Sequence, residues 1–138
     1  MCRFTPIVSD SNFTNSILFY ASVNAGVIQT DFSMTVIATW DLYASRNSED
    51  RIAIEASVYL PELDPRSSND NYRTKIEITG ILGPKYVCGV NSMQSLVLAM
   101  RLLRFHVEMA SEANWKFYFD SESTDQFDLA DAILPEPL

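Results

Sequence analysis

The sequence contains few of the residues from which catalytic and metal sites are usually built. Its 138 residues include one histidine and two cysteines, and the cysteines lack C-x-x-C spacing, so they form no metal or redox motif. Its four glycines are scattered, and none precedes the Lys-Ser/Thr pair of a phosphate-binding loop. We therefore predict no cofactor, no metal site and no catalytic residue that can be identified from the sequence.

Positive charge is also scarce. Ten lysines and arginines stand against eighteen acids, which gives a net charge of −8. An acidic protein is repelled by phosphate groups, so we expect no binding to nucleic acid and none to anionic membranes. The acids gather near the end of the chain, where residues 111–138 hold seven acids and one lysine. A basic protein partner fits this charge, and so does simple solubility.

No run of residues is apolar enough to predict a membrane-spanning helix. Residues 11–30 are uncharged, but asparagine, serine and threonine interrupt them. Residues 17–23 resemble the apolar core of a signal peptide with a cleavage site near Ala25, although Arg3 is the only base before that core. We expect a cytoplasmic protein, because two cysteines suggest no disulfide framework. Export after cleavage near Ala25, or a true start at Met34, remain alternatives.

From Met34 onward, the pattern predicts a sheet. β-Branched and aromatic residues are concentrated in short segments, and several of these alternate between apolar and polar positions. Proline and Asx-rich segments separate them as turns. The predicted strands cover residues 34–43, 52–60, 72–82, 86–90 and 115–119.

The segment Ser92–Ala113 is predicted to form one long helix. Asn91 and Gln94 have the spacing of a capping box, in which Gln94 reaches back to the amide of Asn91. The polar positions of this helix fall on one narrow stripe, and the apolar arc is so wide that it must be covered on more than one side. The sheet covers one side, and the N-terminal segment, the acidic tail or a second subunit covers another. The expected fold class is therefore α+β, with an antiparallel sheet of four to five strands packed against one long helix.

Three parts are expected along the chain. They are an N-terminal extension of uncertain status at residues 1–33, an α+β core domain at 34–119, and an acidic C-terminal tail at 120–138. The tail is turn-rich and is expected to be partly disordered. It also has apolar residues with which it can dock a short helix, namely Phe127, Leu129, Ile133 and Leu134.

The junction between the fourth predicted strand and the helix resembles a known family. The sequence G-V-N-S-M-Q-S-L at Gly89–Leu96, followed by the apolar helix and W-K-F-Y-F, is similar to a bacterial family defined only as a domain of unknown function. That family prefers aspartate at the position of Asn91 and alanine at that of Ser95, and both changes preserve the cap and the helix. The resemblance covers residues 34–119 and implies no known activity. Small bacterial proteins of this kind are sometimes toxin antidotes, which is an analogy only.

Some residues could still carry chemistry. Cys88 and His106 could form a nucleophile–base pair, but the sequence shows no third group to orient them. Asp64 and Asp70 could act as general acid and base, although acids in loops of this composition more often form turns. The acids of residues 120–125 lack the glycine of a calcium loop. An enzyme of unfamiliar type that uses Asp64, Asp70 or His106 is thus the alternative function.

Our principal hypothesis is a small, non-enzymatic protein that binds another protein or forms a homodimer. A specific version is an immunity protein whose acids neutralise the basic face of a toxin and speed its association. Tyrosines that share an open sheet face could add an aromatic patch. The candidate partner-binding residues are Tyr59, Tyr72, Tyr118, Asp120, Glu122, Asp125 and Asp128.

Overall fold

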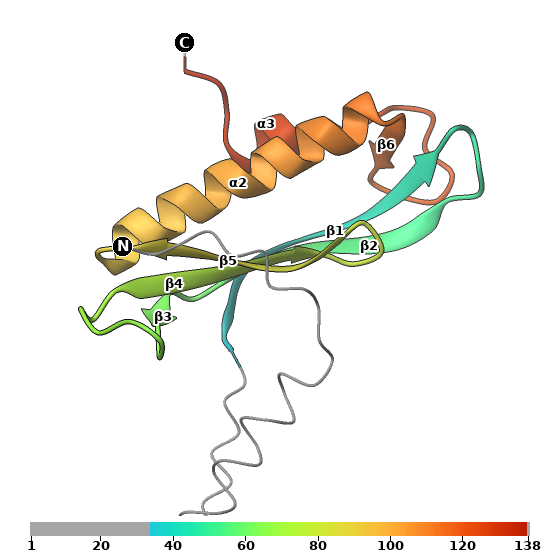
Figure 1. Ribbon diagram of the computed structural model, residues 1–138. Helices are drawn as coiled ribbons and strands as arrows, with labels where there is room; N and C mark the ends of the chain where they lie inside the picture. Colours follow the sequence, from blue (N-terminus) through green and yellow to red (C-terminus); the bar gives the residue numbers. More distant parts are fainter. Residues whose placement is uncertain (1–33, 138) are drawn as a thin grey trace, which may run out of the picture.

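The computed structural model describes residues 34–137. In chain order the elements are β1 (Val36–Arg46), β2 (Ile52–Tyr59), β3 (Glu62–Leu63), β4 (Tyr72–Ile78), β5 (Leu82–Gly89), α2 (Ser92–Glu112), β6 (Trp115–Tyr118) and α3 (Leu129–Ile133). The six strands form one antiparallel sheet, and α2 crosses one of its faces (Figure 1). The predicted α+β class is confirmed. The predictions for the N-terminal extension, the cleavage site near Ala25 and a start at Met34 lie outside the described residues.

The strands are arranged around β4. This strand pairs with β5 on one side and with β2 and the short β3 on the other. β1 pairs with β2, and β6 pairs with the last four residues of β1. The two-residue strand β3 was not predicted, because it is too short to show an alternating pattern and follows a proline at position 61.

The register of the strands defines two faces of the sheet. We call the side that carries Leu42, Ile54 and Ile76 the helix face, because these residues are buried in the core beneath α2. Residues that pair directly across strands share a face, so Lys75 and Tyr86, which are paired, lie together on the opposite, open face. The alternation predicted for β4 is confirmed, since Thr74, Ile76 and Ile78 are all buried. In β2 the predicted inward residues Ile54, Ala56 and Val58 are buried, whereas Ile52 and Leu60 at its two ends are exposed.

The helix α2 begins close against the sheet. The Asn91 side chain accepts a hydrogen bond from the Gln94 amide (2.8 Å), and the Gln94 side chain accepts one from the amide of Val90 (2.7 Å). The predicted cap is therefore present, but Gln94 reaches Val90 rather than Asn91. A Cβ atom on Gly89 would lie 2.5 Å from the Ser95 backbone nitrogen. Only glycine allows this close approach between β5 and α2.

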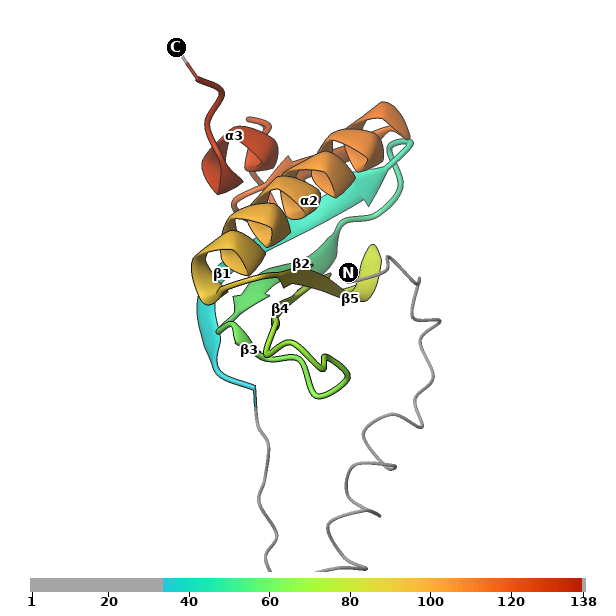
Figure 2. The ribbon, with the colours of Figure 1, turned by 60° about the vertical axis from the view of Figure 1, so that its left-hand side comes forward.

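The C-terminal segment packs on the flank of α2. Asp128 caps α3 by accepting a hydrogen bond from the Asp131 amide (3.0 Å), and Leu129 and Ile133 are buried in the core. Figure 2 shows α3 beside α2. The expectation that the tail docks a short helix through Leu129 and Ile133 is confirmed, because these residues fall four apart on the inner side of α3.

Candidate functional site

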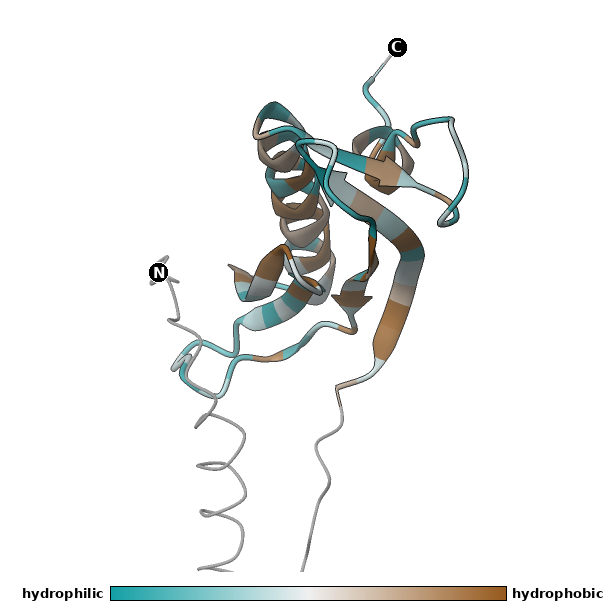
Figure 3. Ribbon diagram, turned by 90° about the vertical axis from the view of Figure 1, so that its right-hand side faces the viewer, coloured by the Kyte–Doolittle hydropathy of each residue, from teal (hydrophilic) through white to brown (hydrophobic). Residues whose placement is uncertain are grey.

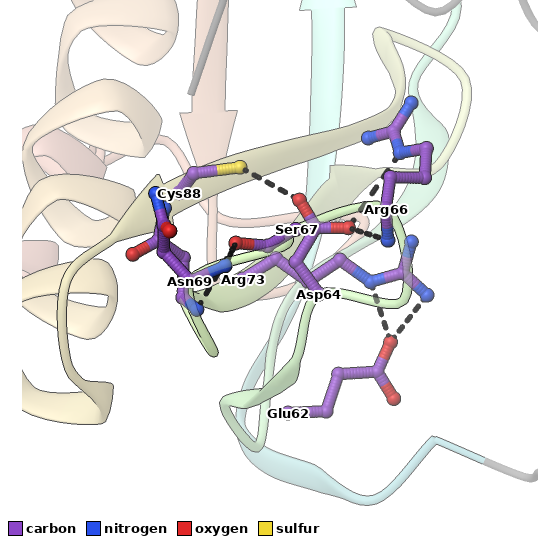
Figure 4. A network of polar contacts seen from close by, with 8 residues as sticks. Glu62, Asp64, Arg66, Ser67, Asn69, Arg73 and Cys88 are labelled. Atoms are coloured by element: carbon purple, nitrogen blue, oxygen red, sulfur yellow. Dashed lines mark hydrogen bonds and ion pairs between the residues drawn. The ribbon is translucent and has the colours of Figure 1, made fainter. Parts of the chain in front are cut away.

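The open face of the sheet holds a buried arginine. The Arg73 side chain is only 6% exposed, and its Nε and Nη2 atoms donate to Glu62 Oε1 at 2.7 and 2.5 Å. Its guanidinium carbon lies 4.6 Å from the centre of the Tyr86 ring. The remaining nitrogen, Nη1, is buried and has no hydrogen-bond acceptor within the described residues. Arg73 is thus held by one carboxylate and one aromatic ring. Figure 4 shows its contact with Glu62.

The loop between β3 and β4 lies beside Arg73. Asp64 is buried, and its Oδ1 atom accepts a hydrogen bond from the Arg66 amide (3.0 Å). Its Oδ2 atom lies 3.5 Å from Cys88 Sγ. Asp70 is exposed in the same loop, with a φ angle of +52°. The expectation that these two acids form turns is confirmed by this geometry, which is an Asx turn at Asp64 and a left-handed residue at Asp70.

A second group of polar contacts lies next to Arg73 on the open face. Tyr59 donates a hydrogen bond to Glu77 Oε1, and the Lys75 ammonium lies 3.1 Å from the same oxygen and 4.3 Å from the centre of the Tyr59 ring. Burial and the hydrogen bond to Glu77 raise the pKa of Tyr59, and burial raises the pKa of Tyr86. Both phenols are therefore neutral near pH 7 and act as donors and stacking surfaces. These polar groups pair with one another, and they do not place a nucleophile beside a base.

The candidate catalytic residues are not brought together. His106 lies half-buried on α2 near Lys85, and burial, followed by the charge of Lys85, lowers its pKa. Cys88 pairs with Arg73 and therefore lies on the open face. The sheet separates Cys88 and Asp64 from His106. Within residues 34–137, no cluster of three or more His, Cys, Asp or Glu side chains could hold a metal ion.

The three candidate tyrosines do not form one patch. Tyr59 and Tyr118 lie on the open face, but Tyr118 is buried beneath the guanidinium of Arg51, 3.6 Å from its ring centre. Tyr72 pairs with Gly89 and lies two residues before Thr74, so it shares the helix face with Thr74. The sequence already contained this signal, because Tyr72 lies two residues before Thr74 and therefore on the buried side of β4, whereas Tyr59 lies on the outer side of β2.

Two of the candidate acids shape the backbone. Asp120 Oδ1 accepts hydrogen bonds from the amides of Glu122 (2.8 Å) and Ser123 (2.5 Å), and Asp128 caps α3. Arg51 donates to the carbonyl oxygens of Asp120 (3.0 Å) and Ser123 (2.5 Å), which holds this loop over Tyr118. Glu122 and Asp125 are exposed.

A row of exposed apolar side chains runs along α2. Met93, Val97, Phe105 and Met109 are 67%, 40%, 52% and 49% exposed, and we call these four residues the outer row. They are separated by multiples of four residues, with Arg101 between Val97 and Phe105, so they follow one ridge of the helix. The prediction that α2 is covered on more than one side is confirmed, because the sheet covers one side and α3, from the predicted C-terminal tail, covers another. Neither reaches the outer row.

Acidic residues flank the C-terminal half of the outer row. Glu108 follows Phe105 by three residues, and Glu112 follows Met109 by three residues. Both acids therefore lie on the same side of α2 as the outer row. Arg104 contacts Glu108 (2.7 Å) and Glu136 (2.8 Å) and donates to the Leu134 carbonyl oxygen. The charge of Arg104 is therefore balanced within the molecule, and Arg101 is the remaining base of this helix face.

Comparisons of the chain with protein-family models, with curated proteins and with solved structures find no match. None of the helices in the described part of the chain combines the length and apolarity that crossing a bilayer requires. The fold is α+β, and the features that bear on function are its exposed surfaces.

Proposed function

We propose that this chain is a non-enzymatic protein-binding domain, and that the outer row of α2 is the centre of its interface. The observation that carries this proposal is the exposure of Met93, Val97, Phe105 and Met109 along one ridge. A row from position 93 to 109 is about 24 Å long at 1.5 Å per residue. Exposed apolar side chains that lie close together typically mark interaction surfaces, and here Arg101 divides the row into the pairs Met93–Val97 and Phe105–Met109.

The surroundings of the row favour a basic partner. Interfaces commonly have an apolar centre and a polar rim, with aromatic residues among the strongest contributors. Phe105 supplies the aromatic centre, and Glu108, Glu112 and Glu136 supply an acidic rim. The net charge of −8 would accelerate association with a positively charged protein.

We propose an immunity protein as the specific form of this function. Such a protein would occupy the basic face of a toxin through its apolar row and acidic rim. This form of the proposal rests on analogy with small bacterial antidotes.

The test compares two sets of truncations of exposed apolar side chains. The protein is used as bait in cells of its own organism, as the wild type, as the double variant Phe105→Ser/Met109→Ser, and as Leu63→Ser. We expect a partner that is retained by the wild type and by Leu63→Ser, and lost by the double variant. Leu63 is a matched control because it is an exposed apolar residue on β3 rather than on α2. Equal retention by all three proteins would refute the outer row as the interface.

A growth experiment tests the immunity function itself. If the captured partner is a toxin, coexpression of the wild-type chain restores growth of cells that produce it, and the double variant fails to do so. A partner that does not impair growth would contradict the immunity function while leaving protein binding intact.

A further inference from the structure

The strand β1 has an edge that is only partly paired. β6 pairs with Tyr43–Arg46 of β1 and leaves Val36–Leu42 without a neighbour on the side away from β2. Within the described residues, no other strand pairs with this stretch. Figure 3 shows it as a largely hydrophobic ribbon at the edge of the molecule, where the chain leaves the grey trace. Alternate residues of this stretch direct their N–H and C=O groups to that side, where no strand pairs with them.

The two outer edges of the sheet differ in how they are protected. Natural edge strands usually carry lysine, proline or inward-pointing charges, which prevent pairing with another strand. The other edge strand, β5, carries Pro84 and Lys85. The open stretch of β1 has the sequence V-I-A-T-W-D-L, with Asp41 as its only charge, and Val36 and Ile37 are exposed. The β1 edge has a β-bulge between Val36 and Ala38, which protects only its first residues, and the regular part that follows is suited to pairing.

We propose that the open edge of β1 pairs antiparallel with the same edge of a second copy of this chain. A two-fold axis at Thr39 aligns Ile37–Asp41 with itself. The β-bulge between Val36 and Ala38 ends the pairing there, because Val36 lies on the open face and Leu42 on the helix face. Directly opposed residues then lie on the same face. Ala38 would stand opposite Trp40 of the second copy, which places a small side chain against a large one on the helix face. The two sheets would become one, with both α2 helices on the same side.

The composition of the edge favours a second copy over a foreign strand. Its alternation of Ala38, Trp40 and Leu42 with Thr39 and Asp41 is self-complementary, because an antiparallel copy keeps apolar residues on one face and polar residues on the other. The axis at Thr39 also separates Asp41 from Asp41 of the second copy. A single acid in seven residues gives little charge with which to select a basic strand. This dimer uses a different surface from the outer row of α2, so it goes beyond the proposed function.

Sedimentation velocity over a range of concentrations tests the dimer. The wild type should show a concentration-dependent monomer–dimer equilibrium. Thr39→Lys should be monomeric at the same concentrations, because two lysines would stand opposite each other at the axis. Thr39 is exposed, so this substitution should leave the fold, measured by circular dichroism, unchanged. The matched control is Ala53→Lys, an exposed position on β2 away from the open edge, which should dimerise like the wild type.

The competing interface is the outer row of α2, and Phe105→Asp tests it in the same experiment. Under the β1 arrangement, Phe105→Asp remains a dimer. The proposal is overturned if the wild type stays monomeric at its highest soluble concentration. It is also overturned if Thr39→Lys remains dimeric, or if Phe105→Asp dissociates the dimer.

Discussion

The hydroxyl groups of Thr74 and Ser95 lie 2.9 Å apart and connect the central strand β4 to the first turns of α2. Both residues are fully buried. The Ser95 hydroxyl donates to the Ser92 carbonyl oxygen (3.0 Å), so the hydrogen between the two side chains comes from Thr74. This contact ties the first turns of α2 to the sheet, next to the close approach at Gly89.

Removing the Ser95 hydroxyl should destabilise the protein more than removing the Thr74 hydroxyl. Ser95→Ala leaves the buried Thr74 hydroxyl without an acceptor and should cost about 1–3 kcal/mol, whereas Thr74→Val leaves Ser95 bonded to Ser92 and should cost less. The double variant should cost less than the sum of the two single variants, because it leaves no orphaned donor. Urea unfolding of the four proteins measures this. Additive costs would show that the two hydroxyls do not act together.

Gly89 should be far less tolerant of substitution than Gly83. Gly89→Ala places a methyl group 2.5 Å from the Ser95 backbone nitrogen, and displacing α2 should cost about 1–3 kcal/mol. Gly83→Ala is the control, since nothing lies within 4 Å of the added carbon, and its effect should stay within about 0.5 kcal/mol. Thermal unfolding of both variants checks the contrast, and similar losses would mean that the β5–α2 junction is looser than described.

The Arg73–Glu62 pair should respond asymmetrically to mutation. Glu62→Gln leaves a buried guanidinium with a weaker partner and should cost about 2 kcal/mol, below the range for fully buried pairs because the Glu62 side chain is 37% exposed. Arg73→Met removes the buried charge together with the unpaired Nη1, and the remaining carboxylate can be hydrated. Arg73→Met should therefore cost less than Glu62→Gln in chemical denaturation. The reverse order would show that Arg73 contributes more through packing on Tyr86 than through its charge.

His106 should make the protein less stable in mild acid. Its pKa in the folded state is lowered from 6.5 by burial and then by Lys85, so the unfolded state binds the proton more readily. Stability from this residue is complete above the unfolded pKa and falls as the pH drops through about 6.5 and below. His106→Gln should therefore flatten the dependence of unfolding free energy on pH between about 7 and 5. An unchanged slope would mean that protonated His106 is accommodated without cost.

Much of the fold follows from patterns within single segments. Alternation in β2 and β4 identified the residues of the helix face, and the cap at Asn91 located the start of α2. Long-range geometry did not follow. Whether Phe105 and Met109 are covered depends on how far the sheet and α3 extend around the helix, which no local pattern specifies.

The candidate site, too, was predicted only where local patterns within one segment were sufficient. Alternation placed Lys75 and Glu77 on the outer side of β4, but it did not reveal that Arg73 would be buried. That burial depends on Glu62, on Tyr86 and on the loop that follows β3, which come from separate segments. Asp120 and Asp128 were noted for their charge, whereas the structure shows both of them in backbone turns and caps.

Site-specific photo-crosslinking tests most directly whether the outer row of α2 binds a protein. A photoreactive phenylalanine analogue is placed at position 105, or at the control position 63 on β3, and the protein is irradiated in cells of its own organism. We predict one discrete protein adduct from position 105 that is absent from position 63 and is weakened by Met109→Ser. No adduct at position 105, or the same adduct from both positions, would contradict the account.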